Sequence, residues 1–77
     1  MELVLVEWVD SAFLQGWMSK ESIKKHEISK CTSVGILANE TANHITVVQS
    51  MSDKQDFGDG ISIPKICIKR IRKLKVK

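Results

Sequence analysis

The segment Leu3-Val4-Leu5-Val6-Glu7-Trp8-Val9 decides the fold of this chain. Its side chains are mostly β-branched, aliphatic or aromatic, which favours a strand, and the turn-favouring pair Asp10-Ser11 follows it. Apolar residues occupy both odd and even positions, so alternate faces of the strand are both apolar. We therefore expect residues 3–9 to form a strand that is buried over most of both faces.

The next segment predicts a loop followed by a short helix. Residues 13–18 show no periodicity, and Gly16 in their middle indicates a turn or loop that carries two large aromatic residues. Ser19 is placed to cap a helix over 20–27, whose positive first turn suits Glu21. The helix has few apolar anchors, so we expect a marginal element that rests on the sheet through three of them: Met18, Ile23 and Ile28.

The middle of the chain has the composition of two strands and two polar connections. Apolar and polar residues alternate over 31–38, and β-branched residues recur over 44–51. The polar residues 39–43 between these strands have the length of a hairpin turn. A second polar stretch, 52–60, is rich in Asp and Gly and predicts a loop with Phe57 in its middle.

The last part of the chain predicts a short strand, a turn and a closing segment. Residues 61–64 form the strand, and Pro64 must end it or confine it to a sheet edge. A single helical turn is expected at 65–67. The segment 68–74 has apolar residues at a three-residue spacing, so it fits either a short basic amphipathic helix or a strand with a bulge: Ile68, Ile71 and Leu74.

A chain of 77 residues has room for one small domain, and its hydrophobic fraction of 43% and charged fraction of 27% are ordinary for globular proteins. Short strands, one short helix and no linker or repeat predict a mainly β fold. The most economical arrangement is a small, strongly bent antiparallel β-barrel of the SH3-like or Sm-like kind. In it, residues 1–77 form a single domain, 75–77 are frayed, and the last strand closes against residues 3–9.

Four motifs stand in a fixed order along the chain: Val6-Glu7-Trp8-Val9-Asp10-Ser11, Gly16-Trp17, Ser33-Val34-Gly35-Ile36-Leu37, and Ile63-Pro64-Lys65-Ile66-Cys67-Ile68 with Ile71 and Leu74. In these motifs the chain resembles a group of short bacteriophage and prophage proteins, over roughly residues 6–74. The resemblance implies a phage origin and an Sm-like or SH3-like fold. It implies no particular activity, although small phage proteins often occlude a host component or sequester a nucleotide signal.

The basic residues are concentrated at the C-terminal end. Residues 1–60 hold five lysines and all nine acidic residues, a net charge of −4, whereas residues 61–77 hold seven basic residues and no acidic one, a net charge of +7. Such a stripe attracts phosphate-bearing partners or an anionic membrane surface. It is equally typical of an edge strand whose lysines block unwanted strand pairing, and the two interpretations stay open.

Cysteine usage and hydropathy favour the cytoplasm. Cys31 and Cys67 lie in no metal-binding or redox motif, which predicts free thiols in a reducing compartment. We recognise no signal peptide and no apolar run of about 20 residues. The expected location is the cytoplasm, that of the host cell for a phage protein, with no membrane partner.

Patterns that carry catalysis or bind metals are weak in this chain. His26, His44 and the two cysteines have none of the short pair spacings of structural zinc sites, and Asp53, Asp56 and Asp59 lack the ligand spacing of a calcium loop. Neither a nucleophile elbow nor a phosphate-cradling glycine loop is found. We therefore expect no enzymatic activity, no metal and no cofactor.

The favoured hypothesis is a non-enzymatic binding protein for nucleic acid or a nucleotide. Such ligands are held by cationic surfaces that carry aromatic stacking platforms. Trp8 is expected in the core, whereas Trp17, beside Gly16, has the better claim to exposure. The candidate ligand contacts are Lys65, Lys69, Arg70, Arg72, Lys73 and Trp17.

The alternative is a protein-interaction module that inhibits or caps a host protein. Its contacts would come from an exposed strand or from the loops that carry Trp17 and Phe57. For either function we expect a homo-oligomer, because the core of such a small domain is limited and residues 3–9 are apolar on both faces.

Overall fold

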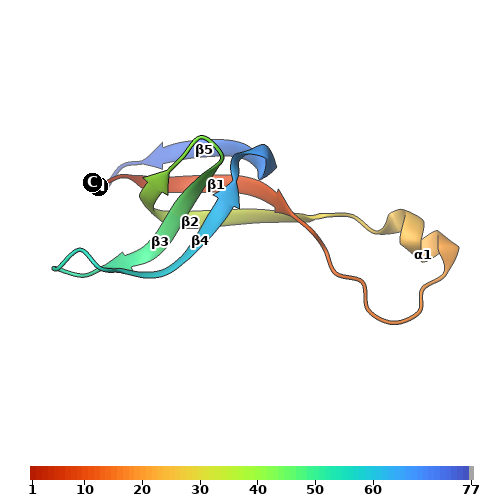
Figure 1. The fold of residues 1–77 in the computed structure, drawn as a ribbon. Helices are drawn as coiled ribbons and strands as arrows, with labels where there is room; N and C mark the ends of the chain where they lie inside the picture. The colour runs from red at the N-terminus through yellow and green to blue at the C-terminus, as the bar shows by residue number, and fades with distance from the viewer. Residues whose placement is uncertain (77) are drawn as a thin grey trace.

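The computed structural model describes residues 1–76, and its elements are, in chain order, β1 (Leu3–Asp10), α1 (Lys20–Lys25), β2 (Ser29–Glu40), β3 (His44–Met51), β4 (Phe57–Pro64), the 3₁₀ turn η1 (Lys65–Cys67) and β5 (Ile68–Leu74) (Figure 1). The five strands form one antiparallel sheet in the order β4-β3-β2-β1-β5. The mainly β fold is therefore confirmed. Residues 75–77 are predicted to be frayed. Lys75 and Val76 follow β5 without regular structure, and Lys77 lies outside the described residues.

β1 is the strand that joins the two ends of the chain. It pairs with β2 along one edge and with β5 along the other, so the predicted contact of the last strand with residues 3–9 is confirmed. Side chains alternate along a strand, and Val4, Val6 and Trp8 share the face that is buried. The Trp8 indole N–H donates a hydrogen bond to Ser33 Oγ at 3.0 Å, which satisfies its polar atom at the edge of the core.

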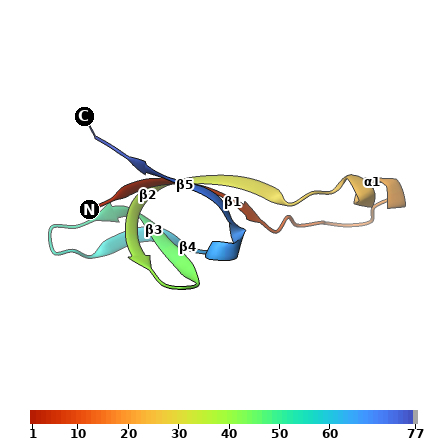
Figure 2. The same ribbon diagram turned by 90° about the horizontal axis from the view of Figure 1, so that it is seen from above.

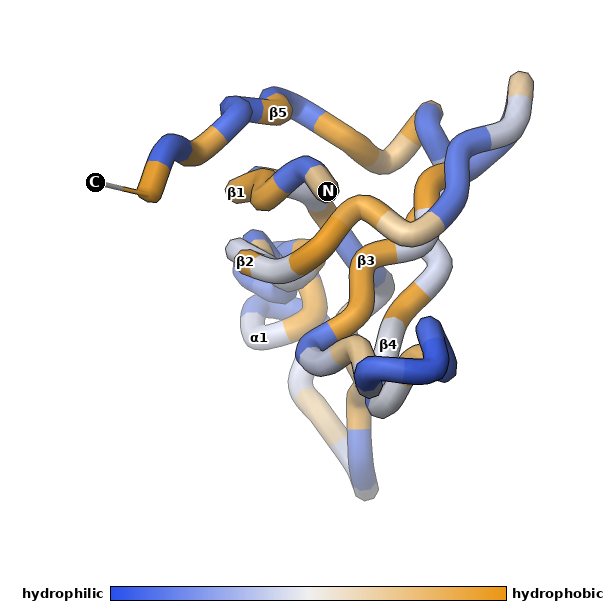
Figure 3. Tube along the Cα trace, turned by 90° about the vertical axis from the view of Figure 1, so that its left-hand side faces the viewer, coloured by the Kyte–Doolittle hydropathy of each residue, from blue (hydrophilic) through white to orange (hydrophobic). Residues whose placement is uncertain are grey.

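The hydrophobic core lies between β1 and the β3–β4 hairpin, because the sheet curves back on itself (Figure 2). The apolar stretches of β1, β2 and β3 lie side by side in Figure 3. Ile45, Val47 and Ile63 are fully buried against the β1 residues. Partly buried side chains complete this cluster: Cys31, Leu37, Cys67 and Ile68.

The sheet bends but does not close into the predicted barrel. Within the described residues, β4 pairs only with β3 and β5 pairs only with β1, so these two strands are the open edges. A closed barrel requires the edge strands to pair with each other. The prediction of a bent antiparallel sheet is correct, and the prediction of closure is wrong.

Gly35 marks the closest approach of β2 to β3. A Cβ atom at this position would lie 2.5 Å from the Val48 carbonyl oxygen and 2.8 Å from Val47 Cγ1. Real Cβ atoms do not approach a backbone oxygen so closely, and the backbone cannot swing away as a flexible side chain can. The hydrogen atom of glycine is therefore what lets β2 and β3 lie together here.

The loop predicted over 52–60 is shorter than expected, because β4 begins at Phe57. At Gly60 a Cβ atom would lie 2.7 Å from Val48 Cγ1, so this glycine fits β4 closely against β3. Gly60, which in the sequence indicates a loop, is thus the residue that permits β4 to pair closely with β3. Residues 52–56 remain a loop, in which the Ser52 N–H donates to the Asp56 carbonyl at 2.8 Å.

β5 follows the second of the two interpretations of residues 68–74. It is a strand whose register against β1 shifts between Glu7 and Trp8, so the amphipathic helix is excluded and the bulge is confirmed. Ile68 lies opposite Trp8, and Ile71 lies opposite the neighbouring core position. The one-residue shift explains the three-residue spacing from Ile68 to Ile71, whereas Leu74 lies opposite Leu3 on the other face.

The segment between β1 and β2 projects away from the sheet (Figure 1), and we call residues 11–28 the arm. Its helix is capped as predicted, since the Ser22 N–H donates to Ser19 Oγ at 3.1 Å. The prediction that this helix rests on the sheet is wrong, because α1 contains no buried residue. The pairing of β1 with β2 ends at Asp10 and Ser29, so the arm continues beyond the end of the hairpin.

We expect Gly35→Ala to lower the free energy of unfolding by about 1–3 kcal/mol, because the added methyl group forces β2 away from β3. Gly58→Ala is the matched control, since its Cβ would lie 3.7 Å from Ser50 Cβ, an ordinary contact. This control should change stability by less than about 0.5 kcal/mol. Urea unfolding followed by circular dichroism measures both variants, and equal stabilities would contradict the assignment.

Candidate anion-binding site

The structure divides the predicted basic residues into two groups, and the first group is engaged in ion pairs. Lys65 Nζ lies 2.8 Å from Glu40 Oε2, and Lys73 Nζ lies 3.4 Å from Glu2 Oε1. Lys73 is also opposite Val4, which places it on the core side of the sheet. The charges of these two lysines are partly compensated by their carboxylate partners.

The second group lies on β5 and is oriented by the bulge. Lys69 is the extra residue of the bulge, and Arg70 lies directly opposite Glu7 on β1. Residues that are directly opposite in an antiparallel pair share one face, so Arg70 and Arg72 lie on the face away from the core. In a regular strand without the bulge, Arg70 would lie two positions after Ile68 and would share its core face.

Lys30 joins this group from β2. The β1–β2 register sets Lys30 opposite Val9 and Thr32 opposite Glu7, again on the face away from the core. Lys30, Thr32, Glu7 and Lys69 line a hollow of about 260 Å³ together with Trp8, Val9 and Cys31. We call Lys30, Lys69, Arg70 and Arg72 the basic patch.

The electrostatics of the basic patch favour an anion. Within the described residues, none of its four side chains forms an ion pair. Glu7 is half-buried among them and brings the local net charge to +3. Two guanidinium groups on one strand, with lysines and the Thr32 hydroxyl beside them, provide donors suited to phosphate oxygens.

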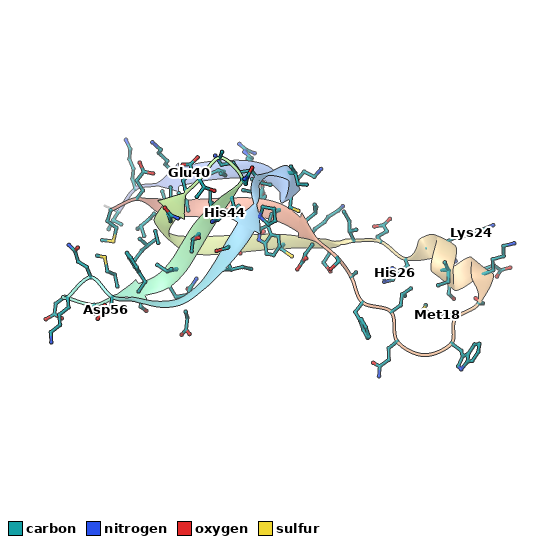
Figure 4. All side chains as sticks on the ribbon, viewed as in Figure 1. Met18, Lys24, His26, Glu40, His44 and Asp56 are labelled. Carbon is teal, nitrogen blue, oxygen red and sulfur yellow. The ribbon has the colours of Figure 1, made fainter. Side chains whose placement is uncertain are left out.

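The aromatic residues do not join the basic patch. Trp8 is buried, as expected, and its indole N–H is already bonded to Ser33. Trp17 is fully exposed, but it belongs to the arm, beside the labelled Met18 in Figure 4, and not to β5. Phe57 is 52% exposed at the start of β4, opposite Met51. Of the predicted ligand contacts, the structure therefore groups Lys69, Arg70 and Arg72 and separates Trp17 from them.

Potential metal ligands are scattered in this fold. Within residues 1–76, no three histidine, cysteine or acidic side chains form a cluster that could hold a metal ion. His26 is exposed at the end of α1, whereas His44 begins β3, where its Nδ1 lies 3.0 Å from Thr41 Oγ1. Cys31 and Cys67 are free, half-buried thiols packed against the core.

Lys30 is the residue of the basic patch that the sequence analysis did not identify. It lies in the acidic first part of the chain, 39 positions before Lys69. Only the register of β2 against β1 and of β1 against β5 brings the two lysines to one hollow. No local pattern in the sequence carries that information.

The hydrogen bond from the Lys65 ammonium, together with its charge, holds the pKa of Glu40 below its ordinary value of 4.5. We expect Lys65→Met to raise this pKa back toward its ordinary value, whereas Lys73→Met should leave it unchanged. Because the pKa is lowered by folding, the pair stabilises the fold at neutral pH, and this contribution is lost as the pH falls through the Glu40 pKa. An NMR titration of the side-chain carboxyl measures the shift, and an unaltered Glu40 in Lys65→Met would contradict it.

No helix of the described residues is long and apolar enough to cross a membrane. Comparison of the chain with protein-family models, with curated proteins and with solved structures found no match.

Proposed function

We propose that this protein is a non-enzymatic binding protein that holds a phosphate-bearing ligand, either nucleic acid or a nucleotide, on the basic patch. The observation that carries the proposal is the β5 bulge, which sets Lys69 and Arg70 beside Arg72 on the face away from the core. A phage origin, proposed from the sequence resemblance, would make the host cytoplasm the place of action.

Phosphate is the anion that this arrangement fits best. Arginine presents planar pairs of N–H donors, which match two phosphate oxygens at once, and lysine adds a point charge. The side chains of Arg70 and Arg72 are two residues apart on one strand face, a spacing of about 7 Å. Adjacent phosphates of a nucleic acid backbone or of a nucleotide polyphosphate can be contacted together at this distance.

The same cations also protect β5, which is an open edge of the sheet. Lysine and arginine on an edge disfavour pairing with a second strand. Edge protection needs charge on β5 alone, whereas ligand binding also uses Lys30 on β2. The variants of Lys30 and of the arginines therefore distinguish the two roles.

We expect Arg70→Gln/Arg72→Gln to weaken binding of a fluorescent single-stranded oligonucleotide by at least about tenfold at low salt. The slope of log affinity against log salt should also decrease by about 1.4, because each lost phosphate contact on a single strand contributes about 0.7. Fluorescence anisotropy over a salt series measures both quantities, with ATP as a competitor that represents free nucleotides.

Lys65→Gln/Lys73→Gln is the matched control, because it removes the same charge from two lysines that are engaged in ion pairs outside the basic patch. It should leave the affinity within about twofold, and Lys30→Gln alone should weaken binding by several-fold. Equal losses in this control and in the arginine variant would mean that net charge, not the basic patch, binds the probe. Wild-type protein that binds no phosphate-bearing probe would favour the protein-interaction module.

A further inference from the structure

The arm exposes an unusual number of large apolar side chains for its length. Trp17 is fully exposed and Phe13 is 86% exposed, and four further apolar residues of the arm are exposed as well: Leu14, Met18, Ile23 and Ile28. Glycine at position 16 takes φ +78°, which turns the chain between the two aromatics. A segment of this kind gains stability only when another surface covers it.

The size of the molecule indicates how much surface remains to be covered. The chain exposes 6448 Å², whereas a compact monomer of 8.7 kDa exposes about 4,700 Å². Its radius of gyration is 16.0 Å, against about 11.5 Å for a compact domain of this length. A standard interface removes about 800 Å² from each partner, so the excess of roughly 1,700 Å² corresponds to two such contacts on every chain.

A surface that matches the arm lies on the β2–β4 side of the same fold. Residues of β2, β3 and β4 line an open hollow of about 520 Å³, which we call the receiving hollow: Thr32, Ser33, Val34, Val47, Gln49, Asp59, Gly60 and Ile61. Ile61, opposite Val47, is 40% exposed there, whereas Val34, opposite Leu5, directs its side chain to the face away from the core. Phe57 precedes Asp59 on β4, so the apolar surface continues toward the 52–56 loop.

The charges of these two surfaces are complementary. α1 carries Lys20, Lys24 and Lys25 against one glutamate. The loop beside the receiving hollow carries Asp53 and Asp56 with Lys54 between them, and Asp59 lines the hollow itself, so this surface has a net charge of −2. Opposite charges around an apolar contact favour one partner and one orientation.

The arm extends away from the sheet, although Thr32 and Ser33 of the receiving hollow follow shortly after it on β2 (Figure 1). Figure 4 places Met18 and Lys24 at one end of the molecule and Asp56 at the other, along an axis of 52 Å. The arm residues are exposed in this conformation, so a second copy can supply the surface that covers them. In this arrangement every chain makes one contact through its arm and one through its hollow. This number matches the two standard contacts to which the excess exposed area corresponds.

We propose that the arm is an assembly element, which seats Phe13 and Trp17 on the receiving hollow of a second copy of this chain. The lysines of α1 lie over the aspartates of the second copy's 52–56 loop. Each chain makes this contact twice, once with its arm and once with its hollow, in a closed assembly of two or more copies. The proposal does not depend on the ligand of the basic patch.

Sedimentation equilibrium of the full chain at micromolar concentration, after nuclease treatment, is the first test. The wild-type protein should have the mass of two or more copies, and Phe13→Ser/Trp17→Ser should weaken association by about 100-fold or more. Ile66→Ser is the matched control, because Ile66 is 93% exposed but lies in η1, outside both surfaces; it should assemble as the wild type does. Neither set of residues belongs to the buried core, and circular dichroism checks that each variant is folded.

A charge exchange then tests which surfaces meet. Lys24→Glu/Lys25→Glu and Asp53→Lys/Asp56→Lys should each assemble poorly alone, since each variant brings like charges together. An equal mixture of the two should assemble again, because each arm then finds a loop of opposite charge in the other variant. Native mass spectrometry of the mixture should detect mixed assemblies only.

Three results would overturn the proposal. A wild-type protein that has the mass of one chain would mean that the arm does not bind a second copy and is available to a different protein. Assembly that survives Phe13→Ser/Trp17→Ser would place the interface elsewhere, for example at the β4 and β5 edges. Mixed charge variants that remain single chains would show that the arm does not meet the 52–56 loop.

Discussion

The pairing of β1 on both of its edges is the constraint on which the rest of this structure depends. β1 is the only described strand that pairs with both β2 and β5. Its alternate residues Val4, Val6 and Trp8 supply half of the buried core. Loss of β1 would leave β5 without a partner strand, and loss of its three core side chains would leave the β3–β4 hairpin without an apolar surface to cover. The register against β1 thus sets the face on which Lys30, Arg70 and Arg72 lie.

The same pairing separates the chemistry of the two sheet faces. Because β1 buries one face, the charged residues of β2 and β5 that oppose Glu7 and Val9 are directed to the other. The bulge at Lys69 determines which of the C-terminal cations join them. One inserted residue therefore converts a generally basic strand into a patch with a defined set of donors, while Lys65 and Lys73 are used for ion pairs.

Features with a local cause could be predicted from the sequence. Residues 3–9, the Ser19 cap and the turn at 65–67 each depend on side chains that are close in the chain, whereas the sequence left 68–74 open between a helix and a bulged strand, and only pairing with β1 decides it. The start of β4, the position of the arm and Lys30 depend on strands that are distant in sequence. Composition alone cannot distinguish a glycine in a loop from one that, like Gly60, allows two strands to touch.

The separation of the arm from the basic patch has a physical consequence for any long anion. The arm leaves the sheet at the β1–β2 end, and the patch lies on the face of β1, β2 and β5. Copies joined through their arms would bring several patches to one polyanion at high effective concentration, although the receiving hollow shares Thr32 with the hollow of the basic patch. A single nucleotide occupies one patch and gains nothing from assembly. If both proposals hold, the ratio of the two affinities would depend on the arm.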